Sequence, residues 1–481
     1  MNFDEIRKNI VGLGQSFDTP FGSFEMIYAD WVASGRLYSP IEEAIMSKFG
    51  PWVANTHSYS NKSGSLMTEA YNHAKQIIRN HVNASDNDML VLTGSGMTGG
   101  VIRLQQILGL CRSGAIPDLV EEDRPIVFIT HMEHHSHHVS WMETVADVVI
   151  VPPGKDLTVD LDFLQAEIDK YSNRKLKIGA FTAGSNVTGV ITPIHDMAEI
   201  MHKNGGYCFV DYAATAPYVT MDMHPENELR SLDAIYFSPH KFLGGPGACG
   251  VMLFDKKMYS GKSCVPGGGN VTWTNPWGEY GFTANDEAKE DGGTPGFLQA
   301  IRAALAIQLK DKMGVAEIEK REEFLLKKTF DRLNSIEGLK IVGEQYSKRI
   351  GVVSFNIDDL HYNALVRIMN DRFGIQIRGG WACASTYCHY LFELNAADSK
   401  RLTDNINDQN LTGKPGWARM SIHPTMTEQE LDYALNAIAY IAQNKAELKK
   451  DYVYDEKTND FTLQKDPVDD NSKQVKEMFA L

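Results

Sequence analysis

The chain has 481 residues, of which 43% are hydrophobic and 23% charged, a composition typical of a globular protein with a large core. Its 47 Lys and Arg residues against 62 Asp and Glu residues give a net charge of −15, which argues against nucleic-acid binding and a polybasic membrane contact. We find neither a run of roughly 18 apolar residues nor a signal-peptide core, and six scattered cysteines are too few for a disulfide framework. We therefore expect a cytoplasmic protein.

Seven short apolar runs in the middle of the chain indicate the strands of a buried sheet. They lie at residues 89–94, 125–130, 147–152, 177–184, 206–213, 234–239 and 250–255. These runs do not alternate cleanly between apolar and polar residues, and amphipathic helical patterns at 98–111 and 194–205 separate some of them. This arrangement predicts an α/β fold with a mainly parallel, seven-stranded sheet.

The pattern changes near residue 296, where a smaller α+β domain is expected. Long helical patterns cover 297–313 and 316–336, and shorter strand and helix patterns follow up to a last amphipathic helix at 427–450. We predict an N-terminal segment, 1–59, that contributes to the small domain and the active site. The large domain would span 60–295, the small domain 296–450, and a polar tail 451–481.

Polar residues follow several of the apolar runs, at the strand ends where α/β proteins bind ligands. A glycine-rich segment at 94–100 leads into a helix pattern with Thr98 near its start, which suits an anion but is also common in ordinary turns. After the second run come five histidines, His131, His134, His135, His137 and His138. One loop cannot aim all five at one ion and HExxH is absent, so we predict no metal site and favour contact with a cofactor ring.

Two charged residues at later strand ends carry more information. Asp211 follows a strongly apolar run, where it would either cap a helix, form a buried ion pair or face a cationic ring nitrogen. Lys241 lies between an apolar run and a glycine-rich loop, where partial desolvation would lower its pKa and suit it to Schiff-base chemistry. Together with the glycine-rich cradle, they supply the parts of a pyridoxal 5′-phosphate (PLP) site.

The segments SNVTG (185–189), VDYAATA (210–216) and SPHKFLGGPG (238–247) resemble those of the fold-type I PLP enzymes of the class V aminotransferase group. The resemblance extends over residues 28–425 and is strongest to the cysteine desulfurase and selenocysteine lyase branch. It implies the PLP-transferase fold, with a large domain and a smaller α+β domain. It also implies a homodimer with shared active sites, an amino-acid substrate and a sulfur-acceptor protein.

The resemblance also implies a role for each matching residue. Lys241 would bind PLP and move the proton at the substrate Cα, Asp211 would pair with the ring nitrogen, and His134 would stack on the ring. Asn186 would contact the ring oxygen and the substrate. Phosphate would be held by Gly96, Met97, Thr98, Ser238, His240 and, across the dimer interface, Thr294. Substrate would be bound by Arg419, Arg378 and His57.

The segment IRGGWACAS (377–385) contains a further candidate residue, a cysteine. Arg378 and Cys383 keep the five-residue spacing of the catalytic loop in the desulfurases, so the resemblance makes Cys383 the nucleophile that takes sulfur from the substrate. A small buried cysteine is the alternative reading. The resemblance therefore implies conversion of L-cysteine or selenocysteine to L-alanine, with the sulfur passed to a cysteine persulfide.

Four positions depart from the desulfurase pattern. Ala214 replaces a frequent Gln, Met97 replaces the first Thr of the phosphate turn, and Trp381 with Ala382 replaces two histidines. These changes leave open a class V aminotransferase, epimerase or other lyase acting on a different amino acid. A non-catalytic binding protein is disfavoured, because it would not need a lysine, an aspartate and an arginine placed in this way.

Overall fold

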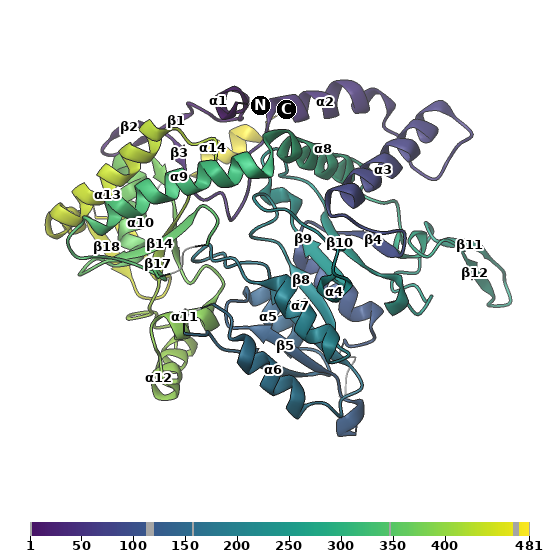
Figure 1. Ribbon diagram of the computed structural model, residues 1–481. Helices are drawn as coiled ribbons and strands as arrows, with labels where there is room; N and C mark the ends of the chain where they lie inside the picture. The colour runs from purple at the N-terminus through teal and green to yellow at the C-terminus, as the bar shows by residue number, and fades with distance from the viewer. Residues whose placement is uncertain (1, 112–119, 156–157, 346–347, 465–470, 481) are drawn as a thin grey trace.

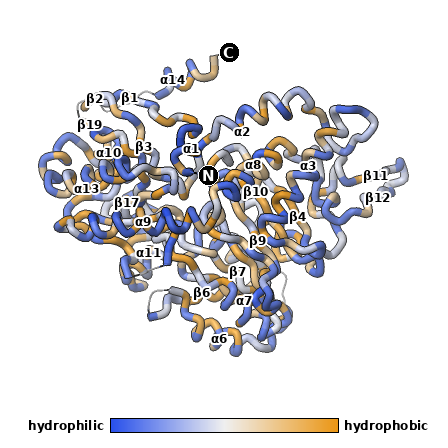
Figure 2. Tube along the Cα trace, turned by 45° about the horizontal axis from the view of Figure 1, so that its top comes forward, coloured by the Kyte–Doolittle hydropathy of each residue, from blue (hydrophilic) through white to orange (hydrophobic). Residues whose placement is uncertain are grey.

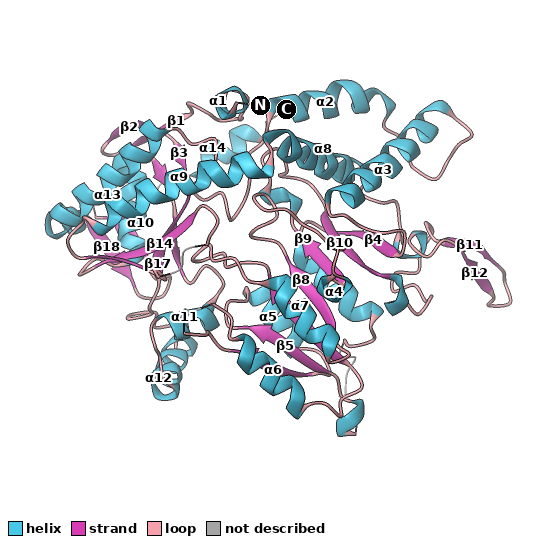
Figure 3. Cartoon of the chain, in the orientation of Figure 1, coloured by secondary structure: helices cyan, strands magenta, loops and turns pink. Residues whose placement is uncertain are grey.

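The computed structural model describes residues 2–111, 120–155, 158–345, 348–464 and 471–480. The chain folds into two lobes, with a large sheet in one and a smaller sheet in the other (Figure 1). Figure 3 shows helices lying on both sides of the large sheet. Hydrophobic residues gather along its central strands, whereas outer helices such as α6 alternate between hydrophobic and polar residues (Figure 2).

The large sheet contains seven strands, as the apolar runs predict. Their order is β4 (Asp88–Thr93), β10 (Gly250–Asp255), β9 (Ala234–Phe237), β8 (Tyr207–Asp211), β7 (Lys177–Thr182), β5 (Ile126–Thr130) and β6 (Asp147–Val151). Six strands are parallel, and β10 runs antiparallel to both of its neighbours. Strands β5 and β7 are buried along their whole length because both faces of the sheet are covered, which explains the missing alternation. The predicted fold class is confirmed.

The helices of this lobe begin after strand ends or connect them. They are α3 (Lys62–His81), α4 (Met97–Ile107), α5 (His135–Met142), α6 (Leu161–Lys170), α7 (Ile194–Lys203) and α8 (Phe297–Met313). Asp160 caps α6 by accepting a hydrogen bond from the backbone of Phe163, whereas α4 begins at Gly96 without a side-chain cap.

The second lobe is built on an antiparallel sheet in the order β13 (Leu339–Ile341), β14 (Val352–Ile357), β17 (Trp417–Ser421) and β16 (Arg378–Gly380). Its helices are α9 (Val315–Asn334), α10 (Tyr362–Phe373) and α13 (Glu428–Leu448). The N-terminal strand β3 (Ile27–Tyr28) pairs with β15 (Ile375–Gln376), which brings the next residues to the border between the lobes.

Shorter elements decorate both lobes. They are α1 (Phe3–Arg7), β1 (Ser16–Thr19), β2 (Gly22–Glu25), α2 (Ser39–Ala44), the projecting hairpin of β11 (Val271–Thr274) and β12 (Tyr280–Phe282), α11 (Ser385–Leu391), α12 (Ala396–Asn407), β18 (Tyr452–Asp455), β19 (Asp460–Leu463) and α14 (Asn471–Met478).

The segment interpreted as a polar tail includes a packed hairpin. Strands β18 and β19 pair antiparallel, and Tyr452 and Leu463 are buried in the core of the second lobe. Residues 465–470 of this segment lie outside the described part of the chain, and the domain boundaries stay predictions. Among the described helices, none combines the length and hydrophobicity needed to cross a membrane.

Candidate active site

A cavity of about 540 Å³ lies between the lobes, at the carboxyl ends of the large sheet's strands. Most residues singled out in the sequence line this cavity. They are Gly96, Met97, Thr98, His134, Asn186, Asp211, Ser238, His240, Lys241, Arg378, Cys383 and Arg419. Five parallel strand ends and two strands of the second sheet supply them, so the fold gathers residues that are more than 300 positions apart in the chain.

Asp211 and Lys241 carry opposite charges at the floor of the cavity. Asp211 is the last residue of β8, is buried, and accepts a hydrogen bond of 2.7 Å from the backbone of Ala213. Lys241 ends the short helical turn Pro239–Lys241 after β9. Burial is the main cause that lowers the pKa of Lys241 to about 8. The charge of Asp211 raises this pKa, and the nearby arginines lower it further. Its amine can therefore lose a proton near neutral pH.

The first turn of α4 forms an anion cradle beside this lysine. Gly96 precedes the helix without a capping side chain, and the backbone N–H of Met97 donates to Ser238 Oγ over 2.9 Å. A Cβ on Gly96 would lie 3.0 Å from the same hydroxyl, so glycine permits the close approach. Burial and the charge of Lys241 lower the pKa of His240 to about 4, which keeps it neutral. Uncapped N–H groups and a hydroxyl suit a phosphate.

His134 faces the cavity from the start of α5. Its Nδ1 accepts a hydrogen bond from the backbone of Ser136 over 3.2 Å, which makes it the N-cap of this helix and fixes the ring. Burial, and then the charge of Lys241, lower its pKa to about 4. A neutral, fixed imidazole can stack on an aromatic cofactor without adding charge to the site.

Two arginines face each other at the opposite side of the cavity. Arg378 and Arg419 are register partners on β16 and β17, where like charges would repel. Asp30 lies between them and accepts hydrogen bonds from Arg378 Nε over 2.9 Å and from Arg419 Nη2 over 2.7 Å. The Nε of Arg419 is buried without a partner among the described residues, so a donor remains for a substrate carboxylate.

Cys383 projects into the cavity from a constrained loop between β16 and α11. Ala382 and Cys383 both adopt left-handed backbone conformations, with φ of 50° and 59°. The side-chain amide of Asn186 donates to the carbonyl of Ala382, and the backbone N–H of His135 donates to the carbonyl of Cys383, each over 2.7 Å. The thiol is exposed, so it can reach a bound molecule. The amide nitrogen of Asn186 thus holds this loop, and the contact of Asn186 with a cofactor stays a prediction.

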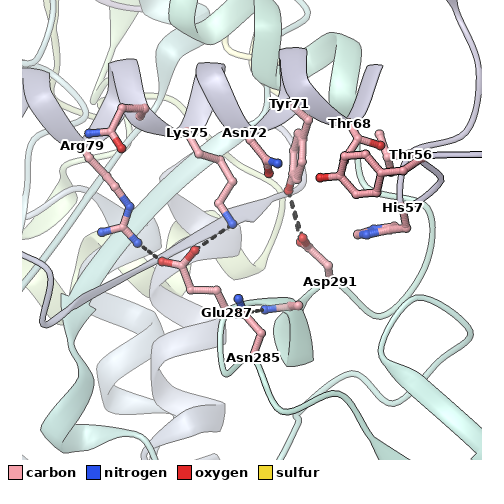
Figure 4. A pocket seen from close by; sticks show the side chains of 13 residues that line it. Thr56, His57, Thr68, Tyr71, Asn72, Lys75, Arg79, Asn285, Glu287 and Asp291 are labelled. Atoms are coloured by element: carbon pink, nitrogen blue, oxygen red, sulfur yellow. Dashed lines mark hydrogen bonds and ion pairs between the residues drawn. The ribbon is translucent and has the colours of Figure 1, made fainter. Parts of the chain in front are cut away.

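Two predicted site residues, His57 and Thr294, do not line the cavity that contains Lys241. His57 is exposed and lines a separate cavity of about 330 Å³ beside α3, together with Tyr71, Lys75 and Asp291 (Figure 4). There the hydroxyl of Tyr71 donates to Asp291 over 3.1 Å. Thr294 is exposed three residues after Asp291 and does not line the cavity of Lys241. The roles of His57 and Thr294 stay predictions.

Sequence reasoning missed several residues that organise the site. Asp30 was not singled out, although an acidic residue directly after a short apolar segment, as in Tyr28–Asp30, is a usable signal. His135, Glu133 and His137 belong to the histidine-rich segment, but their separate roles depend on distant partners. The described residues contain no group of three or more His, Cys, Asp or Glu side chains arranged to hold a metal ion.

The donor set fits PLP. A buried carboxylate can face a ring nitrogen, a lysine of lowered pKa can react with an aldehyde, and an uncapped helix start with a hydroxyl can hold a phosphate. The fold and this set define a PLP-dependent enzyme. The chain belongs to the class V aminotransferase family, whose model matches residues 27–434.

Individual relatives agree with this placement. The chain is 31% identical over 400 residues to a probable cysteine desulfurase from Halalkalibacterium halodurans, covering 81% of this chain and 91% of that protein. A probable cysteine desulfurase from Staphylococcus aureus is 28% identical over 418 residues, covering 86% and 91%. The fold resembles the apo cysteine desulfurase of Thermococcus onnurineus NA1, with a TM-score of 0.72 and 23% identity over 92% and 98% of the two chains. The fold also resembles the CsdA cysteine desulfurase of Escherichia coli, with a TM-score of 0.71 and 21% identity, covering 92% of this chain and 99% of that chain.

Proposed function

We propose that this chain is a PLP-dependent cysteine desulfurase that converts L-cysteine or selenocysteine to L-alanine. The observation that carries the proposal is the exposed Cys383 in the same cavity as Lys241 and Arg419. An aminotransferase needs the lysine and the arginine, but it does not need a thiol in a loop that hydrogen bonds from Asn186 and His135 hold at the cavity. The named relatives support the same activity.

The chain's own residues divide the reaction between the two sides of the cavity. Bound PLP supplies an electron sink for the bond changes at the substrate Cα. Arg419 and Arg378 bind the substrate carboxylate, and Lys241 takes and returns the proton at Cα. On the other side, the thiolate of Cys383 attacks the substrate sulfur as its bond to Cβ breaks. The electron pair of the broken bond stays on Cβ, which in the net reaction gains the proton of the substrate thiol, so that cysteine and the Cys383 thiolate become alanine and a persulfide.

The test compares the wild-type protein with Cys383→Ser after loading with PLP. We expect wild type to release alanine from L-cysteine, and sulfide when a reductant is present, at matched rates. In Cys383→Ser, alanine formation should fall at least about 100-fold, while PLP binding stays unchanged. Alanine release at the wild-type rate by the variant would contradict the persulfide role. Turnover with a keto-acid acceptor and none with cysteine would favour an aminotransferase instead.

The proposed enzyme is a cytoplasmic homodimer that passes its sulfur to an acceptor protein. Six free cysteines suit a reducing compartment. Exposure of Thr294 supports a role toward a second copy. The aromatic side chains Trp273, Trp277 and Tyr280 on the β11–β12 hairpin are 52%, 84% and 62% exposed, which is unusual for an isolated chain and suits an interface.

A further inference from the structure

A buried polar network lies directly beside the carboxylate of Asp211. Thr182, Asp211 and Tyr236 are register partners at the ends of β7, β8 and β9. Partners in neighbouring strands point to the same face, so Asp211 is the middle member of a row of three side chains. Both neighbours in this row are tied to the segment that leads into helix α5.

Glu133 and His137 make these ties. Oε1 of Glu133 accepts hydrogen bonds from the backbone N–H of Thr182 over 2.9 Å and from the hydroxyl of Thr130 over 2.7 Å. Its Oε2 lies 2.6 Å from His137 Nδ1, and His137 Nε2 is hydrogen-bonded to the hydroxyl of Tyr236. The side chains of Glu133 and His137 are 0% exposed. The network therefore spans from one neighbour of Asp211 to the other without contact with water.

The charges in this network favour ionised groups. Burial raises the pKa of Glu133, but the charge and hydrogen bond of His137 hold it below its ordinary value. Burial lowers the pKa of His137, but Glu133 and then Asp211 raise it above the ordinary value. These directions favour a buried glutamate and imidazolium pair, and His137 is close enough to Asp211 for their charges to interact.

Asp211 depends on this pair for its own charge. Burial raises the pKa of its carboxyl group, and the charge of His137 is the largest opposing influence, ahead of the Ala213 N–H and Lys241. Glu133 acts in the other direction. His137, Glu133 and Lys241 are the charged side chains with the largest influence on the pKa of Asp211, and Arg378 and Arg419 line the same cavity. Without His137, the balance moves toward the protonated acid.

We propose that His137, held by Glu133, is a positioning residue that keeps Asp211 an oriented carboxylate against the ring nitrogen of PLP. A carboxylate can hold a proton on that nitrogen, whereas a carboxylic acid cannot. The inference rests on the proposed PLP-dependent function, but only on its cofactor and not on the identity of the amino-acid substrate.

The experiment measures the ring nitrogen directly. The holoenzyme is prepared with PLP carrying ¹⁵N in the ring, and its chemical shift is followed against pH in wild type, His137→Gln and Glu133→Gln. We expect a protonated nitrogen in wild type. His137→Gln should shift the protonation equilibrium about tenfold toward the neutral ring, because an opposite charge near a carboxyl group changes its pKa by about one unit or more. Glu133→Gln should shift it in the same direction but less, because His137 loses the partner that keeps it charged while the Glu133 charge, which itself raises the pKa of Asp211, is also removed. The double variant should add little to His137→Gln.

A matched control separates this effect from general damage to α5. His138 is the next residue of the helix and is also buried, but its Nδ1 faces Thr386, so His138→Gln should leave the nitrogen shift unchanged. If His137→Gln does not fold, Tyr236→Phe removes only the contact at Nε2 and should shift the equilibrium in the same direction, by about threefold.

The inference would be overturned if Glu133→Gln and Tyr236→Phe fold, bind PLP and show the same ¹⁵N chemical shift as the wild-type protein. A neutral ring nitrogen in wild type would overturn it as well. If the ¹⁵N chemical shift depends on His137 as expected but the wild-type protein does not turn over cysteine, only the proposed desulfurase activity is contradicted.

Discussion

At the scale of single residues, Lys241 lies among charges of both signs, and their balance decides how readily its amine loses a proton. Burial is the largest influence and lowers its pKa from 10.5 to about 8. Asp30 raises this pKa, whereas Arg378 and Arg419 lower it. The neutral amine is the form that reacts with the PLP aldehyde, so these neighbours should control how fast the cofactor-free protein takes up PLP.

We therefore predict that the rate of PLP uptake rises with pH and levels off above about pH 8, since the neutral fraction grows through the pKa. Asp30→Asn removes a negative charge, so its midpoint should move to lower pH. Arg378→Gln removes a positive charge and should move it to higher pH. Stopped-flow absorbance after mixing the cofactor-free protein with PLP measures all three profiles. A midpoint near that of a free lysine, or the same midpoint in both variants, would contradict this account.

The same residues show what a sequence can and cannot reveal about a site. Lys241 and Asp211 could be predicted because each directly follows an apolar run, and strand ends in α/β sheets meet at one edge. The position of Asp30 after a short apolar segment is a local signal, but its pairing with Arg419, which is 389 positions away in the chain, is not visible in the sequence. The function of Glu133 and His137 was equally hidden, because the register of β7, β8 and β9 brings their partners together.

At the scale of elements, the loop between β16 and α11 combines backbone strain with tight anchoring. Left-handed conformations at non-glycine residues such as Ala382 and Cys383 cost about 1–3 kcal/mol each and persist where surrounding contacts enforce them. His135 supplies part of that anchoring, because its Nε2 accepts a hydrogen bond of 2.9 Å from the backbone N–H of Ser385. Burial lowers the pKa of His135, which keeps this nitrogen an acceptor.

We predict that His135→Ala releases the cysteine loop while leaving the PLP cradle intact. Amide hydrogen exchange over residues 380–386 should accelerate about tenfold, corresponding to the loss of roughly one net hydrogen bond. PLP affinity should not change, since α4 and Lys241 do not contact the loop through this histidine. His195→Ala is the control, because His195 lies on α7 and is hydrogen-bonded to the carbonyl of Arg230, away from the loop. Unchanged exchange in His135→Ala would show that other contacts hold the loop.

Element prediction from the sequence succeeded where a pattern is local. Each of the seven apolar runs forms a strand of the large sheet, and most of these strands are buried on both faces. The short strand β16 contains Gly379 and Gly380, residues of low strand propensity, so its pairing with β17 had no local signal. That pairing is what places Arg378 opposite Arg419.

At the scale of the whole molecule, the cavity between the lobes contains parts from nearly the full length of the chain. Val32 comes from the N-terminal segment, Lys241 from the large sheet and Arg419 from the second sheet. A change in the relative position of the lobes would move the arginines and Cys383 away from the lysine. The packing of the lobes is therefore a condition for activity, and a second copy of the chain would add a further contact.

We predict that the β11–β12 hairpin contributes to a homodimer. The hairpin projects from the large lobe (Figure 1), its side chains Trp273 and Trp277 are largely exposed, and burying an aromatic side chain of this size is worth about 2 kcal/mol. Trp273→Ser with Trp277→Ser should weaken self-association at least about tenfold, as measured by sedimentation equilibrium across a range of protein concentrations. Phe324→Ser is the control, because Phe324 is 48% exposed on α9 in the other lobe.

PLP affinity links this assembly to the active site. If Thr294 reaches the phosphate of a second copy, the tryptophan variants should lose PLP affinity in parallel with self-association, and Thr294→Ala should lower PLP affinity without changing self-association. Raising the protein concentration should restore PLP binding in the tryptophan variants by mass action, but not in Thr294→Ala. A wild-type protein that stays monomeric at micromolar concentration and still binds PLP tightly would contradict both the dimer and the role of Thr294.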